Sequence, residues 1–374
     1  MKKEKKVIPI FFATDDKYIP FLAVALQSLI ENSSDTNNYV IKILYTNIEE
    51  NNMIANTQIP LVSFIITTYN LPLEYLVECL KSILQLSLNS REREIILVDD
   101  GSDISPINDL VEYQDDIIYI RQSNQGLSIA RNTGLQNASG KYIQFVDGDD
   151  CLIQVGYEHC LDLLRYHNPD IVHFTSSNKT FDKEVPYQYS EPISGSAYLY
   201  NNNLRAAAWC YTFKRDLLQQ QRFTPGILHE DEEFTPILFL KAERIITTDT
   251  KAYYYRERED SIMHKTEDKR HYLKRLADTE KVIFQLQEKS NYLSEPERIA
   301  LNRRIAQLTM DYLYNTIVLA QNYKHLEKNI KRLHDKGLFP LPDKKYTKKY
   351  QIFAKAINNK ITRKILFYTL LKLK

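Results

Sequence analysis

Apolar, β-rich segments alternate with helical patterns through the middle of the chain, and this alternation is what most constrains the fold. The predicted strands are Leu61–Thr67, Glu94–Val98, Ile117–Ile120, Tyr142–Val146 and Asp170–Thr175. Apolar residues at helical spacing predict helices between them, at 76–84, 127–137 and 155–166. Strands that alternate with helices through short loops form a mostly parallel sheet with helices on both faces. The sequence therefore predicts an α/β fold.

Polar residues directly follow three of the predicted strands. Thr68–Asn70, Asp99–Ser102 and Asp147–Asp150 each begin where a strand ends. Ligands of open parallel sheets bind beyond the carboxyl ends of the strands. These clusters therefore predict a ligand site at one edge of the sheet.

The cluster after the strand at 142–146 is the most acidic of the three. It holds three carboxylates, Asp147, Asp149 and Asp150. Their mutual repulsion is relieved by a cation, and a hard divalent ion of the magnesium type keeps phosphates and waters in its shell. The segment predicts a site for a metal-bound diphosphate, with a solvated acidic turn as the alternative.

The remainder divides into an irregular part and a helical part. Residues from about 178 to 265 are aromatic and irregular, which is typical of a pocket-forming region. The pattern is helical from about 268 onward, and a capping box at Ser294–Glu297 opens a long helix that is predicted to reach about Asn322.

Composition limits the function classes. The chain has 374 residues, 43% of them hydrophobic, enough for a large core and more than one domain. A net charge of +1 gives no general attraction to nucleic acid, and no nucleic-acid partner is expected. Four cysteines without a CxxC pair indicate reduced thiols in a cytoplasmic protein. No stretch approaches the roughly 18 apolar residues that span a bilayer.

Five ordered segments resemble the motifs of family-two glycosyltransferases, which are inverting enzymes with the GT-A fold. They are Pro60–Asn70, Val98–Ser102, Asn124–Gly134, Phe145–Asp150 and His229–Phe234. The resemblance covers about residues 60–265. It implies a nucleotide-sugar donor such as a UDP-sugar, a divalent metal (Mn²⁺ or Mg²⁺) and inversion at the anomeric carbon.

The resemblance assigns the first two clusters to the nucleotide. Thr68, Tyr69 and Asn70 follow the first strand, where Tyr69 contacts the base and Asn70 holds the turn. Asp99 or Asp100 lies near the base or ribose, since a carboxylate accepts hydrogen bonds from uracil N–H or ribose hydroxyls. A simple turn is the alternative for the Asp-Gly-Ser run.

The metal and diphosphate have their own candidates. Arg131 either pairs with phosphate or holds a loop carboxylate such as Asp99 or Asp147. The resemblance makes Asp149 the direct metal ligand and places Asp147 at the ribose or at a metal-bound water. His264 completes the metal shell in one reading and is structural in the other.

The acceptor side depends on the His-Glu-Asp element. The resemblance makes Asp231 the base that deprotonates the acceptor hydroxyl, with Glu230 orienting it or binding the acceptor. The alternative is an exposed acidic N-terminus of a helix at 232–241. Trp209 either stacks on an acceptor sugar or packs in the core.

The N-terminal residues follow a different pattern. Val7–Ala13 and Val40–Tyr45 are predicted strands, Tyr18–Glu31 is a predicted helix, and a polar linker follows. This βαβ unit resembles the truncated opening of a family-eight glycosyltransferase and is not expected to be active by itself. The predicted domains are therefore 1–57, a GT-A domain at 58–265 and a helical region at 266–374.

The C-terminal segment 344–374 carries ten Lys or Arg and no Asp or Glu. Its apolar residues recur every three or four positions: Tyr350, Phe353, Ile357, Ile361, Ile365 and Tyr368. This pattern predicts an interfacial helix on anionic lipid, so that the protein is peripheral on the inner face of the plasma membrane. A helix packed on the domain is the alternative.

These observations favour an inverting, metal-dependent glycosyltransferase that acts on a glycan or lipid-linked glycan in surface polysaccharide synthesis. An inactive glycan-binding or scaffold protein of the same fold is the first alternative. A sugar-nucleotide pyrophosphorylase is disfavoured because Thr67–Asn70 lacks the glycines of a phosphate loop.

Overall fold

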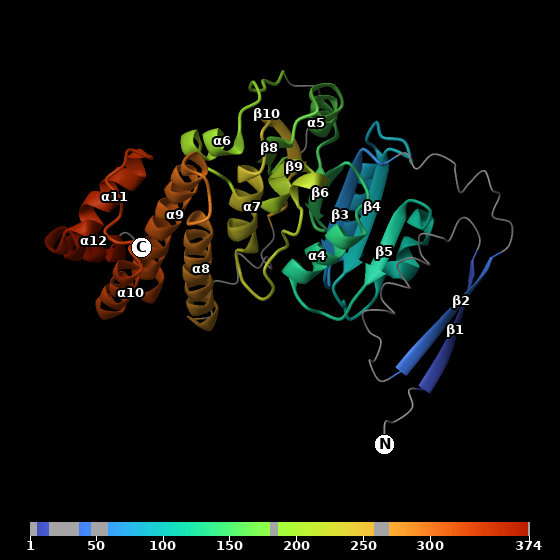
Figure 1. The fold of residues 1–374 in the computed structure, drawn as a ribbon, viewed down its shortest axis with the longest axis horizontal. Coiled ribbons are helices and arrows are strands. Elements are labelled where there is room, and N and C mark those ends of the chain that lie inside the picture. The colour runs from blue at the N-terminus through green and yellow to red at the C-terminus, as the bar shows by residue number, and fades with distance from the viewer. Residues whose placement is uncertain (1–5, 15–36, 46–58, 180–185, 258–268, 373–374) are drawn as a thin grey trace.

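The computed structural model describes residues 6–14, 37–45, 59–179, 186–257 and 269–372. Figure 1 shows a twisted sheet with flanking helices, and a helical region, α8 to α12, at one end beside α6 and α7. This arrangement is the predicted one, a mostly parallel sheet flanked by helices with a helical C-terminal extension.

The main sheet has eight strands in the order β5-β4-β3-β6-β9-β8-β10-β7. Their bounds are β3 Val62–Thr68, β4 Arg93–Asp99, β5 Ile117–Arg121, β6 Tyr142–Asp147, β7 Cys151–Leu152, β8 Ile171–Ser177, β9 Tyr211–Lys214 and β10 Ile245–Tyr254. All of these strands run in one direction except β7 and β9. Each strand predicted from 61 to 175 is therefore confirmed.

Helices cover the sheet and form the C-terminal region. The α-helices are α3 Leu73–Leu84, α4 Leu127–Asn137, α5 Gln154–His167, α6 Gly195–Asn201, α7 Glu230–Leu240, α8 Lys269–Ser290, α9 Glu295–Asn315, α10 Tyr323–Asp335, α11 Lys348–Asn358 and α12 Lys360–Lys372. The predicted capping box is present at the start of α9, and a π-helical segment, Thr316–Ala320, continues the helix.

β3 lies at the centre of the core and is buried along its whole length. Its mostly apolar sequence reflects this burial, because both faces of the strand are covered. Gly134 of α4 permits the covering helix to approach: an added Cβ would lie 2.2 Å from Cγ2 of Ile65. The close packing fixes α4, and with it Arg131, against β3 and β4.

The region from 178 to 265 is more regular than its sequence indicated. β9 pairs with β6 and β8, and β10 pairs with β8, so both belong to the main sheet. β9 is only four residues long, and β10 mixes Thr, Asp and Lys with its apolar residues. Such strands are specified by neighbouring strands more than by their own pattern, which is why the sequence did not reveal them.

The two N-terminal strands form a sheet of their own. β1, Lys6–Thr14, pairs in parallel with β2, Asn37–Tyr45, which confirms both predicted strands. The predicted helix Tyr18–Glu31 lies outside the described residues.

Deletion of residues 1–57 is expected to leave a folded protein. The main sheet begins at β3 and contains neither N-terminal strand. Circular dichroism and thermal unfolding of the truncated chain should show the cooperative transition of the full chain. Insoluble protein, or loss of cooperative unfolding, would show that the first unit is integral to the fold.

The basic tail is two helices and not one. α11 ends before Asn359, whose side-chain oxygen accepts a hydrogen bond of 2.9 Å from the backbone N–H of Ile361 at the start of α12. The break divides the predicted stripe: Tyr350, Phe353 and Ile357 are buried in the protein, whereas Ile361, Ile365 and Tyr368 are 75%, 61% and 52% exposed. The prediction of a single apolar face was therefore wrong.

Candidate functional site

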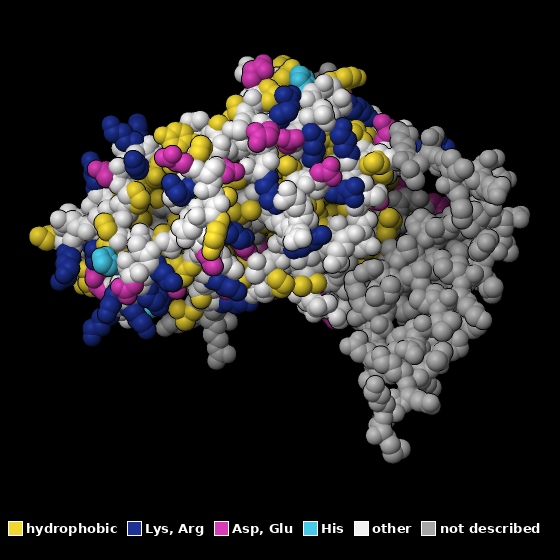
Figure 2. Space-filling view, viewed as in Figure 1, with side chains coloured by type: hydrophobic (Ala, Val, Ile, Leu, Met, Phe, Trp, Pro, Cys, Tyr) yellow, Lys and Arg dark blue, Asp and Glu magenta, His cyan; other side chains and the backbone are white. Residues whose placement is uncertain are grey.

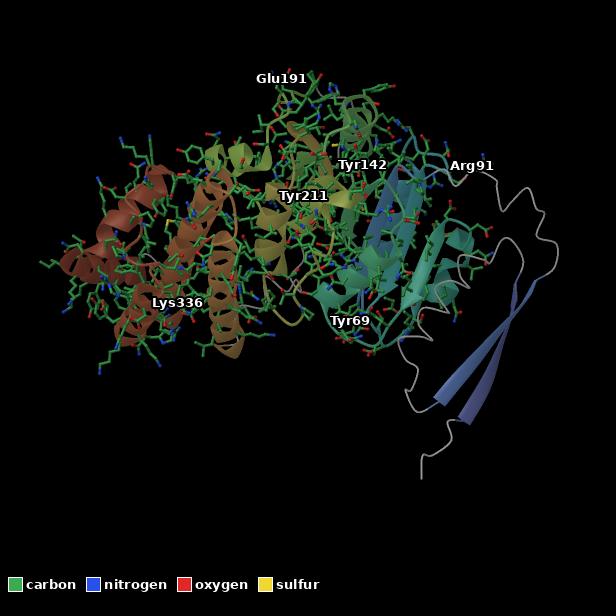
Figure 3. All side chains as sticks on the ribbon, in the orientation of Figure 1. Tyr69, Arg91, Tyr142, Glu191, Tyr211 and Lys336 are labelled. Carbon is green, nitrogen blue, oxygen red and sulfur yellow. The ribbon has the colours of Figure 1, made fainter. Side chains whose placement is uncertain are left out.

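The three predicted clusters meet at the carboxyl edge of the sheet. Figure 3 shows Tyr69, which follows β3, at the opposite edge from Arg91, which precedes β4. The backbone N–H of Asn70 donates to Oγ of Ser102 over 2.9 Å, and the N–H of Asp103 donates to Oδ1 of Asn70 over 2.8 Å. Asn70 has a positive φ of 48°, which Asn tolerates better than most residues. Asn70 thus joins the first two loops, while Tyr69 remains half exposed.

Asp99 and Asp100 are both buried and both hold loops together. Asp99 accepts hydrogen bonds of 2.9 Å from the Ser102 N–H and from the Tyr119 hydroxyl. Asp100 accepts from the backbone N–H of Gln125 over 3.0 Å and of Gly126 over 2.7 Å. These carboxylates therefore shape the loops around the predicted nucleotide site; direct contact with a base or ribose stays a prediction. Thr68, at the end of β3, is also buried.

Arg131 connects the acidic turn to α7. It is 3% exposed, and its two terminal nitrogens donate to Asp147 Oδ1 over 3.0 Å and to Glu230 Oε1 over 2.7 Å. Burial lowers the pKa of Arg131, but Asp147 and Glu230 outweigh burial and raise the pKa above its ordinary value. The partner of Arg131 in this structure is thus Asp147, one of the alternatives open from sequence, together with Glu230, which sequence did not indicate.

The turn Asp147–Asp150 is tightly held. Arg256 donates through Nε to the carbonyl oxygen of Asp149 and through its backbone N–H to Oδ1 of Asp150, both over 2.8 Å. The guanidinium of Arg256 also pairs with Glu78. Burial raises the pKa of Asp150 to about 8, and the charge of Asp147 raises it as well. The turn therefore concentrates negative potential at the sheet edge.

The donor atoms of this turn suit a hard cation. Asp147 and Asp150 are engaged by Arg131 and Arg256, and within the described ranges no group of three or more His, Cys, Asp or Glu is arranged to hold a metal. A Mg²⁺- or Mn²⁺-like ion needs few protein oxygens, because phosphates and waters supply the other ligands. Asp149 fits that requirement, and the second predicted ligand, His264, lies outside the described residues.

Asp231 lies in the first turn of α7, which contains Glu230, Asp231, Glu232 and Glu233. Burial raises the pKa of Asp231 well above its ordinary value, and the charges of Glu230 and Glu232 raise it further, while Arg131 lowers it. A carboxylate in this environment holds a proton more strongly than a solvated one, as suits a general base. The predicted alternative, an exposed acidic helix end, does not describe Glu230 and Glu233, which are 8% and 6% exposed.

Trp209 is packed in the protein. It is 6% exposed, and its ring stacks on Tyr253 with 4.4 Å between centroids and lies near the guanidinium of Arg205 at 4.6 Å. Of the two readings from sequence, the geometry favours core packing. Its predicted contact with an acceptor sugar is untested.

Sequence reasoning missed the contribution of the helical region to α7. Arg304 of α9 pairs with Glu232, Lys289 of α8 pairs with Glu233 over 2.7 Å, and Asp278 of α8 accepts a 3.0 Å hydrogen bond from the backbone N–H of Leu228. The acidic run at the start of α7 indicated that cations must lie nearby, but the sequence did not show which residues supply them.

Comparison with known proteins identifies the class. Residues 63–222 match the family model described as Glycosyl transferase family 2. This part of the chain is therefore similar to glycosyltransferase family 2, which confirms the resemblance that the order of its motifs indicated.

Curated relatives agree. The chain is 32% identical over 219 residues to Glycosyltransferase GlyA of Streptococcus pneumoniae, and the match covers 54% of this chain and 31% of GlyA. It is 33% identical over 220 residues to the uncharacterized glycosyltransferase EpsJ of Bacillus subtilis, covering 54% of this chain and 63% of EpsJ. The chain thus spans less than two thirds of either relative.

Solved structures share the fold. TarS of S. aureus, solved with UDP-GlcNAc, superposes with a TM-score of 0.59 at 19% identity and covers 83% of this chain and 90% of that one. Mannosyltransferase PcManGT from Pyrobaculum calidifontis, solved with GDP-Man and Mn²⁺, gives 0.50 at 14% identity and covers 95% and 94%. The fold is of the GT-A type.

Proposed function

We propose that the chain is an inverting, metal-dependent glycosyltransferase that moves a sugar from a nucleoside diphosphate, such as UDP, to a hydroxyl of a glycan or lipid-linked glycan. One observation carries this proposal: Arg131 bonds Asp147 of the acidic turn and Glu230 of α7 at the same time. The candidate donor site and the candidate base are therefore two parts of one buried network. The ligands in the structures of TarS and PcManGT support a nucleotide-sugar donor.

The donor would lie along the carboxyl edge of the sheet. Tyr69 is half exposed and free to cover a base, while Asn70, Asp99 and Asp100 fix the loops beneath it. The diphosphate would extend toward Asp147–Asp150. An ion held by Asp149 would offset the charge that builds up on the departing diphosphate.

The transfer step needs one proton acceptor. The acceptor hydroxyl oxygen attacks the anomeric carbon, the bond from that carbon to the diphosphate oxygen breaks with its electron pair, and Asp231 takes the hydroxyl proton. Attack from the side opposite the leaving group inverts the anomeric configuration. The pairing of Arg131 with Asp147 and Glu230 would fix the position of Asp231 relative to the turn Asp147–Asp150.

A non-catalytic scaffold of the same fold is the main alternative. Intact Asp149 and Asp231 favour the enzyme. A thermal-shift screen of nucleotide-sugars with Mn²⁺ identifies the donor, and ¹H NMR of the transfer product reports the anomeric configuration. Retained configuration, or no donor that stabilises the protein, would contradict the proposal.

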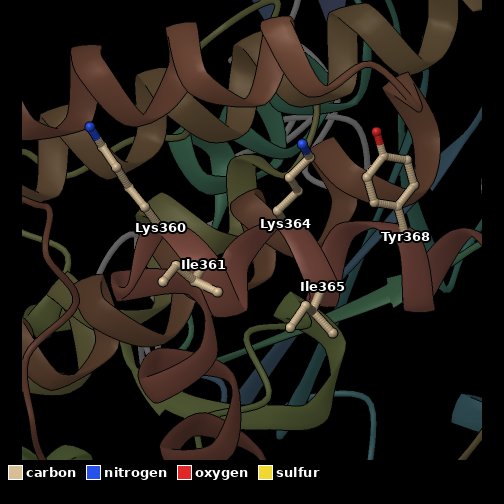
Figure 4. Close-up of a pocket in the computed structure, with 5 residues that line it drawn as sticks. All are labelled: Lys360, Ile361, Lys364, Ile365 and Tyr368. Carbon is tan, nitrogen blue, oxygen red and sulfur yellow. The ribbon is translucent and has the colours of Figure 1, made fainter.

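We also propose that α12 contacts an anionic membrane. Figure 4 shows Ile361 and Ile365 on one side of the helix and Lys360, Lys364 and Tyr368 on the adjoining side. Figure 2 shows Lys and Arg side chains gathered at this end of the molecule. Exposed apolar residues beside cations favour anionic lipid, where each Lys or Arg contributes about 1 kcal/mol. Within the described ranges, no helix has the length and apolar character to cross a bilayer.

The double variant Ile361→Glu, Ile365→Glu is expected to lose binding to anionic vesicles. Both side chains are exposed, so the fold should be unaffected, whereas truncation after Pro342 would also remove buried Tyr350. Co-sedimentation with phosphatidylglycerol vesicles measures the loss, and Ile299→Glu, at a half-exposed isoleucine of α9, is the matched control. Equal binding by the double variant and wild type, or no binding by wild type, would refute the contact.

A further inference from the structure

The first turn of α7 is neutralised by three different elements. Glu230 pairs with Arg131 of α4, Glu232 with Arg304 of α9, and Glu233 with Lys289 of α8. Asp231, between them, has no ion pair with any described residue. Two of the three neutralising cations come from the C-terminal helical region, outside the matched family segment.

The helical region also fixes the entry into α7. Asp278 accepts a hydrogen bond of 3.0 Å from the backbone N–H of Leu228, and Nε of Arg275 lies 3.4 Å from Nε2 of His229. His229 precedes the helix with a positive φ of 66°, a conformation that is uncommon for residues other than glycine. Such a conformation persists where surrounding contacts determine it.

Of the two cations that the C-terminal helices supply, Arg304 is more buried than Lys289. It is 9% exposed, whereas the side chain of Lys289 is 44% exposed. An ion pair that is mostly shielded from water is screened less than a surface pair. The loss of the Arg304 charge would therefore change the electrostatic potential at neighbouring residues of α7. Arg304 also acts on Asp311 of α9, whose pKa is raised by burial and lowered by Lys349 and Arg304.

We propose that Arg304 is a positioning residue for Asp231: by pairing with Glu232 it holds the first turn of α7 and cancels the neighbouring negative charge. The proposal rests on the proposed role of Asp231 as base. It gives the C-terminal helices a direct part in the chemistry of the sheet domain.

The expected consequence is electrostatic. Asp231 interacts electrostatically with Glu230 and Glu232 of α7, Arg131 of α4, Cys210, and Tyr211 of β9. The other charged or titratable groups in the first turn of α7, at its entry, or in contact with these residues are His229 and Glu233, Asp147 of β6, Arg275, Asp278 and Lys289 of α8, and Arg304 and Asp311 of α9. Glu232 raises the pKa of Asp231. Removal of Arg304 leaves that charge unbalanced and should raise the pKa of Asp231 further.

The test is the pKa of the Asp231 carboxyl group, followed by ¹³C NMR in Asp-labelled protein and assigned with Asp231→Asn. Arg304→Gln should raise this pKa by about 1 unit, as expected for one charge removed at roughly 12 Å with an effective dielectric constant near 20. Arg304→Lys, which keeps the charge, should restore most of the wild-type value. Arg303→Gln is the matched control, because Arg303 is the adjacent buried arginine of α9 but bonds the carbonyl oxygens of Leu199 and Asn202.

A double-mutant cycle separates charge from structure. Glu232→Gln should lower the pKa of Asp231, and Glu232→Gln combined with Arg304→Gln should cancel most of the shift seen with Arg304→Gln alone. A pKa that does not move in Arg304→Gln, or moves equally in Arg303→Gln, would overturn the proposal. Because NMR titration needs no turnover, a failure here is distinguishable from failure of the proposed activity; where donor turnover is measurable, its acid limb should move with the pKa.

Discussion

Asp231→Asn is expected to lower kcat by about 10²–10⁴-fold while affinity for the metal-bound nucleoside diphosphate stays nearly unchanged. The amide cannot take the proton of the acceptor hydroxyl, but it preserves the shape of the residue. Single-turnover transfer measures the first quantity, and titration calorimetry with the diphosphate and Mn²⁺ measures the second. A collapse of donor affinity would place Asp231 in the donor site and contradict its role as base.

The stability of Asp231→Asn is the control that separates loss of the base from loss of the fold. The folded-state pKa of Asp231 is raised, so the carboxyl group stabilises the fold at low pH, and this contribution is lost as pH rises from the ordinary Asp value, near 4, through the folded value. Asp231→Asn should therefore unfold at the same or a higher denaturant concentration than wild type at about pH 8, with the advantage shrinking toward about pH 4. A variant that is less stable at the higher pH would have lost activity through its fold.

Asp149→Asn is expected to abolish metal-dependent binding of the nucleoside diphosphate while the fold survives. The turn that holds Asp149 is fixed by Arg256 through the backbone of Asp149, and this contact does not depend on the carboxylate. Titration calorimetry with UDP in the presence of Mn²⁺ or EDTA measures the effect. Asp109→Asn, at an exposed carboxylate on the 3₁₀ helix Pro106–Tyr113, should bind like wild type. Unchanged affinity in Asp149→Asn would remove the metal role.

The parts of the fold that sequence predicted well are those with strong local patterns. The helix α4 was predicted at 127–137 and begins and ends at those residues, since Gly126 stands before it and β6 follows a short turn. The strands β3, β4 and β6 are rich in apolar residues along most of their length, as expected for strands covered on both faces. The polar residues after them meet in space because parallel strands end at one edge.

The parts that sequence missed depend on contacts between distant segments. The pairing of Arg131 with Glu230 joins residues far apart in the chain, and the ion pair of Glu232 with Arg304 joins two domains of the predicted scheme. The tail shows the opposite error: a regular stripe across Tyr350 and Ile365 looked like one helix face, but the cap at Asn359 divided it. Periodicity alone does not show where a helix breaks or what covers its face.

Release of nucleoside diphosphate from the nucleotide-sugar selected by thermal shift, with Mn²⁺ and a glycan acceptor, tests the central claim most directly. Wild-type protein should release the diphosphate, and EDTA, Asp149→Asn and Asp231→Asn should each suppress that release. Release at the wild-type rate by either variant, or in the presence of EDTA, would contradict a metal-dependent glycosyltransferase with Asp231 as its base.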